Sequence, residues 1–458
     1  MKGLFVTVLW GLFLIGSAHA QPKDQLLDSL FQTANKRGFF NGNVLVAEKG
    51  AVIYQSQIGF ADAGKTKKLT PELRFNIGSI SKGLSAFSIM KLHEQGRLKL
   101  DDSVSEFIEN LPDWSRQVTM RHLLEYSSGL PNVDYLRIFS DEDAWRVLRN
   151  LKQLEFEPGT DHLYSNYNIF LRERIIEKVS GQKYPKYLTS VILTPCGMEN
   201  VVIDPTPTSP ALAKAFDNKF VEDNYPTTMS GAMHMTINDL YQWTKCLNDY
   251  KIISKSSFLE LAAGYKTLGL VQMDNQDWVF YYHHGSSYNF ESSVYVNQPE
   301  EFTVILTTNN KNFNVGDLTN AADDILRDEP FEIPKKSLYM TLRTEIFYNG
   351  FESGTRRYQY ITGNDQEHYD LTNIERDLIK TGRYLIGKDK IRDGVNTLKL
   401  VVSEFPDSWN AHLILADTYQ EIGENELAFH SYQKALGLNS ENEEIKLKLK
   451  KIKDKSSR

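Results

Sequence analysis

Hydrophobic and polar residues alternate near the N-terminus in a pattern that predicts a β-hairpin. The segment NVLVAEKGAVIYQSQIGFAD alternates on both sides of Glu48-Lys49-Gly50. A period of two is typical of strands with one buried face, and a short break containing glycine marks the turn between them. A helix-like segment over residues 25–37 precedes the hairpin.

The period then changes to that of helices and returns to that of strands. Helices are expected over residues 78–95, 120–126, 141–152, 167–180 and 237–247. Past residue 268 the runs LGLVQM, WVFYYHH, ESSVYVN and FTVILTTN lie between turn signals, and a helix over 315–327 follows. Residues 24–328 therefore have strands at both ends and helices between, which favours one α/β (α+β) domain whose sheet is closed by both ends of the segment.

The remainder of the chain predicts a linker and a small all-α domain. DEPFEIPKKS carries Pro330 and Pro334 and marks a boundary, and residues 329–371 have weak periodicity, typical of a linker with one short helix. HLILADTYQEIGENELAFHSYQKALGLNSEN resembles a tetratricopeptide repeat, and a degenerate copy precedes it by about 34 residues. Residues 372–455 are therefore interpreted as tetratricopeptide-like helical repeats, which bind a protein partner or pack against the preceding domain.

The N-terminus has the pattern of a secretory signal. Lys2 precedes an apolar run over residues 4–15, and Ala18-His19-Ala20 is a small-x-small cleavage site. The alternative is a membrane anchor, but the run is short for a membrane span. We expect a cleaved signal peptide over residues 1–20, a periplasmic or secreted protein, and no stable membrane anchor after cleavage.

Composition limits the partners and cofactors. The chain has 458 residues and a formal net charge of -7, which disfavours nucleic acid as a partner. Its two cysteines, Cys196 and Cys246, are expected to be buried thiols, and a disulfide outside the cytoplasm is the alternative. No Cys/His cluster has zinc spacing, so no metal is expected.

A serine and a lysine in FNIGSISKGLSAF are the first candidates for chemistry. Ser79 and Lys82 are three residues apart at the start of a helical run, so both side chains share one helix face. A lysine whose pKa is lowered by burial or by another cation can accept the serine proton. The alternative is a helix cap with a solvated lysine. The same spacing occurs by chance elsewhere, at Ser88/Lys91, Ser180/Lys183 and Ser431/Lys434.

Two later motifs could supply the other groups. In YSNYNIF, Tyr164 can shuttle a proton and Asn166 can bind a substrate amide. In YYHHGSSYNFES, His283 and Gly285 lie on a predicted sheet edge, where a strand can bind an extended substrate. His283 could hydrogen-bond a substrate carboxylate or help to activate the leaving group, and the N–H of Ser286 could stabilise an oxyanion. Each motif alone is weak, and a turn histidine pair is the alternative for the last.

The order of the three motifs resembles that of the penicillin-recognising serine enzymes. Further blocks in the same order strengthen the resemblance, among them VTMRHLLEYSSGLP, FEPGTDHLYSNYN and SGAMHMTINDLYQW. Over roughly residues 40–310 the chain is similar to the family of class C β-lactamases, D-alanyl-D-alanine carboxypeptidases, D-aminopeptidases and related esterases. The resemblance implies an antiparallel sheet of five or more strands flanked by helices, and no metal or organic cofactor.

The resemblance also implies a role for each motif residue. Ser79 would be the nucleophile, Lys82 its base or the base's partner, and Tyr164 the proton shuttle. Asn166 would hold the substrate amide, and the N–H groups of Ser79 and Ser286 would form the oxyanion hole.

Three departures from the family pattern bear on substrate. His283 stands where the lactamases have lysine, which argues against a dedicated β-lactamase. Asn289 stands where glycine is usual and could narrow or polarise the cleft, and Tyr126 replaces a frequent histidine. We therefore expect an exported serine hydrolase that acts on amides or esters, with D-amino-acid peptides or esters preferred to β-lactams. The alternative is a penicillin-binding-protein-like binding or sensor protein that recruits a partner through its C-terminal repeats.

Overall fold

The fold is described from a computed structural model of the chain. It covers residues 21–456 except 39, 136, 207, 224–228, 265, 276 and 312–314. The expected signal peptide, residues 1–20, lies outside the described residues. Among the residues described, no helix has the length and apolar character needed to cross a bilayer.

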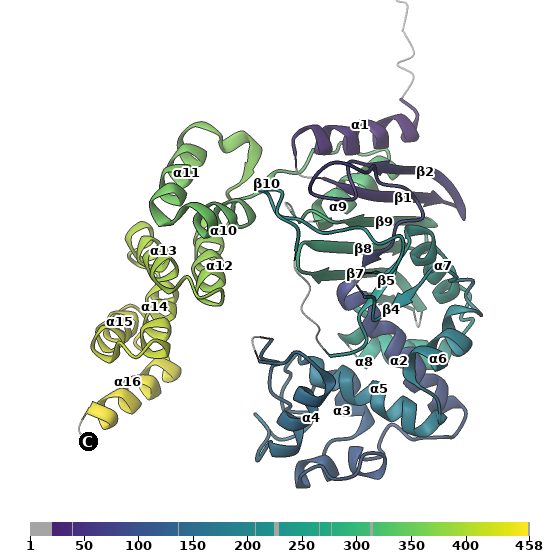
Figure 1. The fold of residues 1–458 in the computed structure, drawn as a ribbon, viewed down its shortest axis with the longest axis horizontal. Coiled ribbons are helices and arrows are strands. Elements are labelled where there is room, and N and C mark those ends of the chain that lie inside the picture. The colour runs from purple at the N-terminus through teal and green to yellow at the C-terminus, as the bar shows by residue number, and fades with distance from the viewer. Residues whose placement is uncertain are drawn as a thin grey trace, which may run out of the picture.

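The centre of the molecule is a six-stranded antiparallel sheet of order β2-β1-β9-β8-β7-β6 (Figure 1). The strands are β1 Gly42–Glu48, β2 Ala51–Ile58, β6 Leu270–Asp274, β7 Asp277–Ser287, β8 Phe290–Asn297 and β9 Phe302–Thr308. β1 pairs with β9 along its whole length, so the first and last strands of the segment meet at the middle of the sheet. The predicted closure of the sheet by both ends is confirmed.

Alternation along the strands produces two cores, one on each face of the sheet. Val44 and Val46 pack under the helices α1 Lys23–Lys36 and α9 Val315–Leu326, which cover one face (Figure 1). Leu45 and its neighbour Ala47 face the larger core, which contains most of the remaining helices. The functional residues described below lie on this second side.

Five of the helices between β2 and β6 have close to the predicted bounds, and two more, over 184–188 and 255–264, were not predicted. They are α2 Ser81–Glu94, α3 Met120–Glu125, α4 Asp141–Asn150, α5 Asn166–Ser180, α6 Tyr184–Leu188, α7 Ile237–Asn248 and α8 Lys255–Gly264. A small sheet joins β3 Phe75–Asn76, β5 Met233–Met235 and β4 Val202–Ile203. Single turns complete the region: η1 Gly78–Ile80, η2 Val104–Glu106, η3 Asp113–Arg116, η4 Thr189–Leu193 and η5 Lys266–Leu268.

The two cysteines form a disulfide, so the expectation of two buried thiols is wrong. Cys196 follows η4 and Cys246 lies in α7, with their Cα atoms 5.5 Å apart. This separation lies within the usual range for a disulfide. Sequence could not decide between the alternatives because the two residues are 50 positions apart and are brought together only by packing of these two elements.

The C-terminal residues form an elongated group of helices beside the sheet (Figure 1). They are α10 Leu338–Asn349, α11 Phe351–Asn364, α12 Ile374–Ile386, α13 Ile391–Glu404, α14 Trp409–Glu421, α15 Asn425–Leu438 and α16 Glu443–Ser456, with η6 Gln366–His368 and the paired strands β10 Lys336–Ser337 and β11 Tyr369–Asp370. The expected linker therefore contains two full helices where one short helix was predicted. Leu338 and Tyr358, from these two helices, pack in the same apolar cluster as residues of the later helices. This packing explains why the segment is helical.

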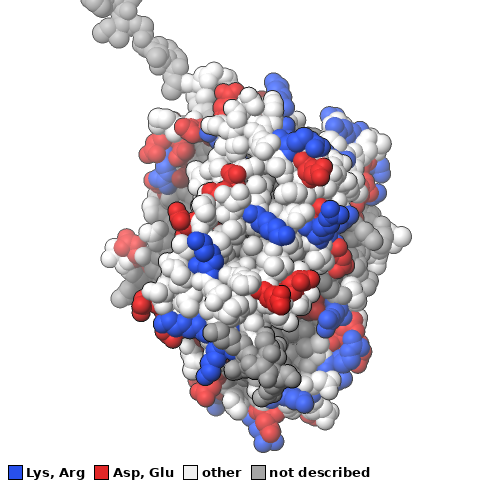
Figure 2. Space-filling view, turned by 90° about the vertical axis from the view of Figure 1, so that its left-hand side faces the viewer, with Lys and Arg blue, Asp and Glu red and all other residues white. Residues whose placement is uncertain are grey.

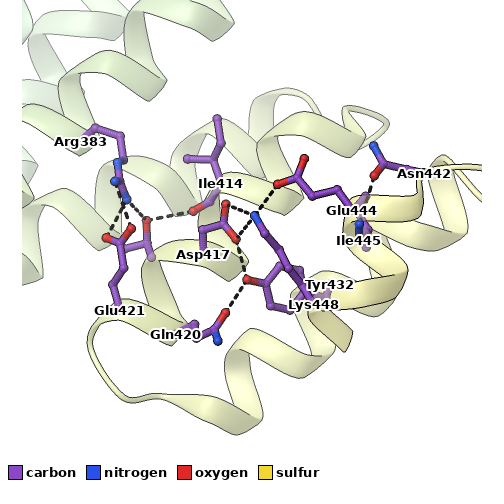
Figure 3. Close-up of polar contacts among 11 residues, drawn as sticks. Arg383, Ile414, Asp417, Gln420, Glu421, Tyr432, Asn442, Glu444, Ile445 and Lys448 are labelled. Carbon is purple, nitrogen blue, oxygen red and sulfur yellow. Dashed lines mark hydrogen bonds and ion pairs between the residues drawn. The ribbon is translucent and has the colours of Figure 1, made fainter. Parts of the chain in front are cut away.

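Polar contacts tie the last helices to one another (Figure 3). Asp417 on α14 accepts hydrogen bonds from Tyr432 on α15 and from Lys448 on α16, the latter at 2.8 Å. Arg383 on α12 pairs with Glu421 on α14 at 2.8 Å. Each ion pair is partly exposed and contributes little alone, so the shared apolar cluster provides most of the cohesion.

One helix of the C-terminal group touches the sheet region directly. Arg343 on α10 donates to the side chain of Asn289, in the turn between β7 and β8, at 2.9 Å. Glu345 on the same helix pairs with Lys219 at 2.8 Å.

On the face that Figure 2 shows, basic and acidic side chains are intermixed over the surface.

Candidate active site

Ser79 lies in a tight turn between a strand and a helix. The turn η1 follows β3 and leads directly into α2. The side chain of Asn76 accepts a hydrogen bond from the N–H of Gly78 at 2.8 Å, and the hydroxyl of Ser81 donates to the carbonyl of Gly78 at the same distance. These bonds hold the serine at the entrance of the helix, with its side chain on the cavity wall.

The Ser79 hydroxyl contacts both predicted partners. Nζ of Lys82 donates to Oγ of Ser79 at 3.0 Å, and the phenol oxygen of Tyr164 lies 2.8 Å from the same atom. One residue therefore bonds a potential base and a potential proton shuttle at once. Lys82 is engaged with the serine and is not a solvated helix residue, so the geometry disagrees with the interpretation as a simple helix cap.

The surroundings of Lys82 favour its neutral form. Burial lowers the pKa of its ammonium group, and the nearby charge of Arg172 lowers it further. Tyr126 and Glu173 act in the opposite direction. Since the pKa lies below that of an ordinary lysine, the neutral amine is available to accept a proton at lower pH.

Tyr164 stands at the loop end that leads into α5. Partial removal from water raises the pKa of its phenol, and the hydrogen bond with Ser79 opposes this rise. Its ring packs against that of Tyr126, with centroids 4.8 Å apart, and Nζ of Lys82 lies 5.3 Å from the ring centroid. Tyr126, at the position where histidine is frequent, thus packs against the ring of Tyr164.

Asn166, the first residue of α5, lines the same cavity. Its Nδ2 donates to the hydroxyl of Tyr135, a residue that the sequence did not single out. Its Oδ1 is buried without a hydrogen-bond partner in the described structure. An amide with an unused acceptor at the cleft can bind an N–H group of a substrate.

The strand β7 approaches the serine turn at two glycines. A Cβ atom on Gly285 would lie 1.9 Å from the carbonyl oxygen of Ile77, and one on Gly78 would lie 2.3 Å from the nitrogen of Ser286. Gly78 also has a φ of +51°. Only glycine permits this approach, which brings the N–H of Ser286 beside the residue that precedes Ser79.

The side chain of His283 lies behind the cavity instead of in its wall. It is 5% exposed and its Nδ1 lies 3.1 Å from the hydroxyl of Tyr281. Burial lowers the pKa of His283 to about 3, and the charge of Lys82 acts in the same direction. A neutral imidazole packed under the serine turn offers no cation to a substrate carboxylate, and its predicted hydrogen bond to the substrate stays a prediction.

Asn289 also points away from the cleft, against the expectation that it narrows it. Its backbone N–H and its side chain both donate to Asp223, at 2.8 and 2.6 Å, and its Oδ1 accepts from Arg343. The neighbouring Tyr288 lines the cavity. The departure at this position therefore fixes the turn beside the cleft to helix α10.

Lys311 is a further residue near the site that the sequence did not indicate. Its Nζ donates to Oγ of Ser286 at 2.5 Å and pairs with Glu291 at 3.3 Å. Glu291 also accepts from His284 at 3.2 Å. The sequence contains no signal for Lys311, because it is a single lysine in an asparagine-rich segment after the last strand. The order of the strands in the sheet brings this segment next to β7 and β8.

The cavity at Ser79 has a volume of about 480 Å³, which is within the range of small-molecule sites. It is lined by residues of η1, α2, α5, β7 and the segment 229–233. In the described ranges, no group of three or more His, Cys, Asp or Glu residues is arranged to hold a metal ion.

Comparisons with known proteins show which family the chain is similar to. A sequence model of the family described as Beta-lactamase matches residues 27–328. A penicillin-binding protein of Bacillus subtilis (strain 168) is 30% identical over 268 residues, which are 52% of this chain and 58% of that protein. The chain thus spans less than two-thirds of the length of this relative.

Two solved structures share the fold at lower identity. The octameric penicillin-binding protein homologue from Pyrococcus abyssi is 23% identical, with a TM-score of 0.59 and coverage of 71% of this chain and 81% of that one. The D-amino acid amidase from Ochrobactrum anthropi SV3, in complex with L-phenylalanine amide, is 18% identical, with a TM-score of 0.58 and coverage of 67% and 99%.

Proposed function

The chain belongs to the beta-lactamase family, and we propose that it is an exported serine hydrolase that forms an acyl-enzyme on Ser79. The observation that carries the proposal is the pair of contacts at its hydroxyl, with Lys82 Nζ at 3.0 Å and the Tyr164 phenol at 2.8 Å. A nucleophile held between a lysine of lowered pKa and a phenol has both groups that acyl transfer requires.

Acylation starts with proton transfer from Ser79 to neutral Lys82 as Oγ attacks the carbonyl carbon of the substrate. The N–H groups of Ser79 and Ser286 donate to the oxyanion of the tetrahedral intermediate. The proton held by Lys82 passes through Tyr164 to the leaving nitrogen or oxygen, the scissile bond breaks, and the acyl group remains as an ester of Ser79. Asn166 holds the amide of the acyl group.

Deacylation uses the same groups in reverse roles. A water molecule attacks the ester carbon and gives one proton through Tyr164 to Lys82, and this proton passes to Oγ of Ser79 as the ester bond breaks. The carboxylic acid then leaves and the starting state is restored. No redox step or cofactor takes part in this sequence.

The proposed substrates are amides or esters of D-amino acids in preference to β-lactams. Two features support this choice: His283 stands where lactamases have lysine, and it lies buried and neutral under the serine turn. The test is hydrolysis of D- and L-alanine p-nitroanilides, a p-nitrophenyl ester and a penicillin by the mature chain and by Ser79→Ala. We expect turnover of the D-amide or the ester that Ser79→Ala abolishes, and undiminished turnover in Ser79→Ala would contradict the assignment.

The proposal of export is supported by the disulfide between Cys196 and Cys246, because such bonds persist outside the reducing cytoplasm. The N-terminal sequence predicts the signal itself. Edman sequencing of the protein recovered from the periplasm or the medium tests both. A start at residue 21 is expected, and a protein confined to the cytoplasm with an intact N-terminus would contradict export.

The alternative is a binding or sensor protein that recruits a partner through tetratricopeptide-like C-terminal repeats. The contact of Arg343 with Asn289 favours it, because it joins helix α10 to the turn beside the cleft. The test is a pull-down with the full chain, compared with a variant that lacks residues 372–458. A partner that depends on these residues, together with slow acylation and no turnover, would favour this function over hydrolysis.

A further inference from the structure

Glu173 is a buried carboxyl group that faces the cavity and takes no part in the proposed chemistry. It lies on α5, seven residues after Asn166, and both side chains line the cavity. Glu173 is 2% exposed. Two helical turns separate the two residues, which corresponds to about 10 Å along the helix axis. The cavity thus extends from the acyl-transfer centre to an acidic group at its inner end.

The carboxyl group of Glu173 is incompletely paired. Its Oε2 is buried and has no hydrogen-bond partner in the described structure. A guanidinium nitrogen of Arg174 lies 3.7 Å from it, but the same guanidinium also pairs with Asp141 at 2.9 Å and with Glu177 at 3.3 Å. Arg174 thus divides its charge among three carboxyl groups, and Arg172 is a second cation that acts on Glu173 without a hydrogen bond to Oε2.

Charged groups face Glu173 from several elements, and burial dominates their combined effect. Burial raises the pKa of Glu173 well above its ordinary value. The charges of Arg174 and Arg172 lower the pKa of Glu173, and those of Asp204 and Asp141 raise it. Glu173 in turn raises the pKa of Lys82 and of Tyr184. A cation brought into this pocket would compensate the charge that burial otherwise makes costly.

The wall opposite Glu173 leaves room for the carboxyl group. A Cβ atom on Gly231, whose φ is +106°, would lie 2.5 Å from Oε1 of Glu173. Asp141 accepts from the N–H of Ser230 at 2.7 Å, and Asp204 accepts from the N–H of Gly231 at 2.6 Å. The segment is therefore held in place with a residue that has no side chain next to the carboxyl group.

From these observations we propose that Glu173 forms a subsite for an ammonium group at the end of the acyl arm of the substrate. The arm would pass along the apolar wall of Ile169 and Phe170, which lies between Asn166 and Glu173 on the same helix. The inference rests on the proposed acyl transfer at Ser79 and narrows its substrate class. The favoured acyl group is a chain of several methylene groups that carries a terminal ammonium.

The test compares p-nitrophenyl esters that differ only in the end of the acyl arm. The pairs are 6-aminohexanoyl with heptanoyl, 8-aminooctanoyl with nonanoyl, and glycyl with propionyl. The readout is the ratio of kcat/KM for the ammonium ester to that for its methyl-terminated partner. We expect the wild type to prefer the ammonium by about tenfold or more for a long arm, as for a hydrogen bond to a charged group, and to show little preference in the glycyl pair, whose arm is too short.

The variant Glu173→Gln should lower the long-arm ratio by about tenfold. Glu177→Gln is the matched control, because Glu177 shares Arg174 but does not line the cavity, and its ratio should stay within about threefold of the wild type. A long-arm ratio that Glu173→Gln leaves unchanged would overturn the proposal, even if both rates fall. A preference largest for the glycyl pair, or no preference in the wild type, would overturn it as well.

A binding measurement on the wild type separates this inference from the proposed function and does not depend on the folding of any variant. Calorimetric titration with hexylamine, and with hexan-1-ol as its neutral counterpart, requires no turnover. We expect the amine to bind about tenfold more tightly or better. Equal affinity would overturn the subsite, whereas tight amine binding without ester hydrolysis would retain the subsite and contradict the hydrolase.

Discussion

Lys82 shares its buried surroundings with a second cation, Arg172. The Arg172 guanidinium is fully buried, donates to the hydroxyl of Thr267 at 2.9 Å, and has a second, longer contact of 3.4 Å to the carbonyl of Lys82. It lies on α5, next to Glu173. A buried cation that contacts the lysine backbone disfavours a charge on the lysine side chain.

The variant Arg172→Met tests this electrostatic role. Removing the cation should raise the pKa of Lys82, so that the neutral amine is lost at a higher pH and the acid limb of the kcat/KM profile moves upward. At pH 7 the activity should fall by about tenfold, within the contribution of a positioned general base. Arg172→Lys keeps a charge and serves as the control. An unchanged acid limb in Arg172→Met would show that this residue does not tune Lys82.

The sequence predicted Ser79 and the two residues that contact its hydroxyl, but not the groups behind them. Ser79 and Lys82 share one helix face, and the position of Tyr164 followed from the resemblance. The burial of His283 and the exposure of Glu173 to the cavity depend on how α5 and β7 pack, which no local pattern encodes. The paired acidic and basic residues on α5 look like an ordinary charged helix until the fold buries them.

At the scale of elements, the site depends on the close approach of η1 to β7. The turn carries Ser79 and the strand carries Ser286, and the two glycines 78 and 285 permit the contact between their backbones. Both donors of the proposed oxyanion hole are thus set by the distance between two elements. The His-x-Gly pattern indicated this strand. The structure shows that the pattern needs glycine at position 285 because a side chain there would collide with the backbone of Ile77.

The variant Gly285→Ala tests this approach. Its Cβ would lie 1.9 Å from the carbonyl oxygen of Ile77, and backbone must move to relieve the contact. We expect kcat for ester hydrolysis to fall by about a hundredfold or more, the usual effect of losing one oxyanion donor. Gly363→Ala in α11, where the added atom meets nothing within 4 Å, is the control. Full activity in Gly285→Ala would contradict the proposed oxyanion hole.

At the scale of the whole molecule, both ends of residues 24–328 meet in one sheet, and helices α2 and α5 between them form part of the cavity wall. This arrangement was predictable because strand and helix periods are clear and the strand runs stand at both ends. The two helices over 338–364 were not predictable, because their apolar residues do not form a complete helix face by themselves. The later helices pack against them and complete the apolar cluster. Their contact through Arg343 with Asn289 could be seen only in the structure.

The disulfide gives the molecule a measurable constraint. Cys196 and Cys246 close a loop of 50 residues, and the chain-entropy model assigns such a loop about 4 kcal/mol of stabilisation. The double variant Cys196→Ala/Cys246→Ala should lower the free energy of unfolding in urea by about this amount. Dithiothreitol should destabilise the wild type similarly and leave the double variant unaffected. Equal stability of the two proteins without reductant would contradict the bond.

Stability should also depend on pH through a buried histidine. His234 is 6% exposed and burial lowers its pKa to about 4 from 6.5. Between these values the unfolded chain binds a proton that the folded protein excludes, so the free energy of unfolding falls as pH decreases, by up to about 3 kcal/mol. His234→Phe should reduce this slope in urea titrations at pH 7 and pH 4.5. An identical slope in the variant would show that His234 is not the source.

The central claim is that Ser79 becomes acylated with Lys82 and Tyr164 at its hydroxyl, and intact-protein mass spectrometry tests it most directly. The mature chain would be incubated with a penicillin and, separately, with a p-nitrophenyl ester, alongside Ser79→Ala. The account predicts a mass increase equal to the acyl group, or ester turnover, in the wild type and neither in the variant. An adduct of the same size on Ser79→Ala, or no adduct and no turnover in the wild type, would contradict it.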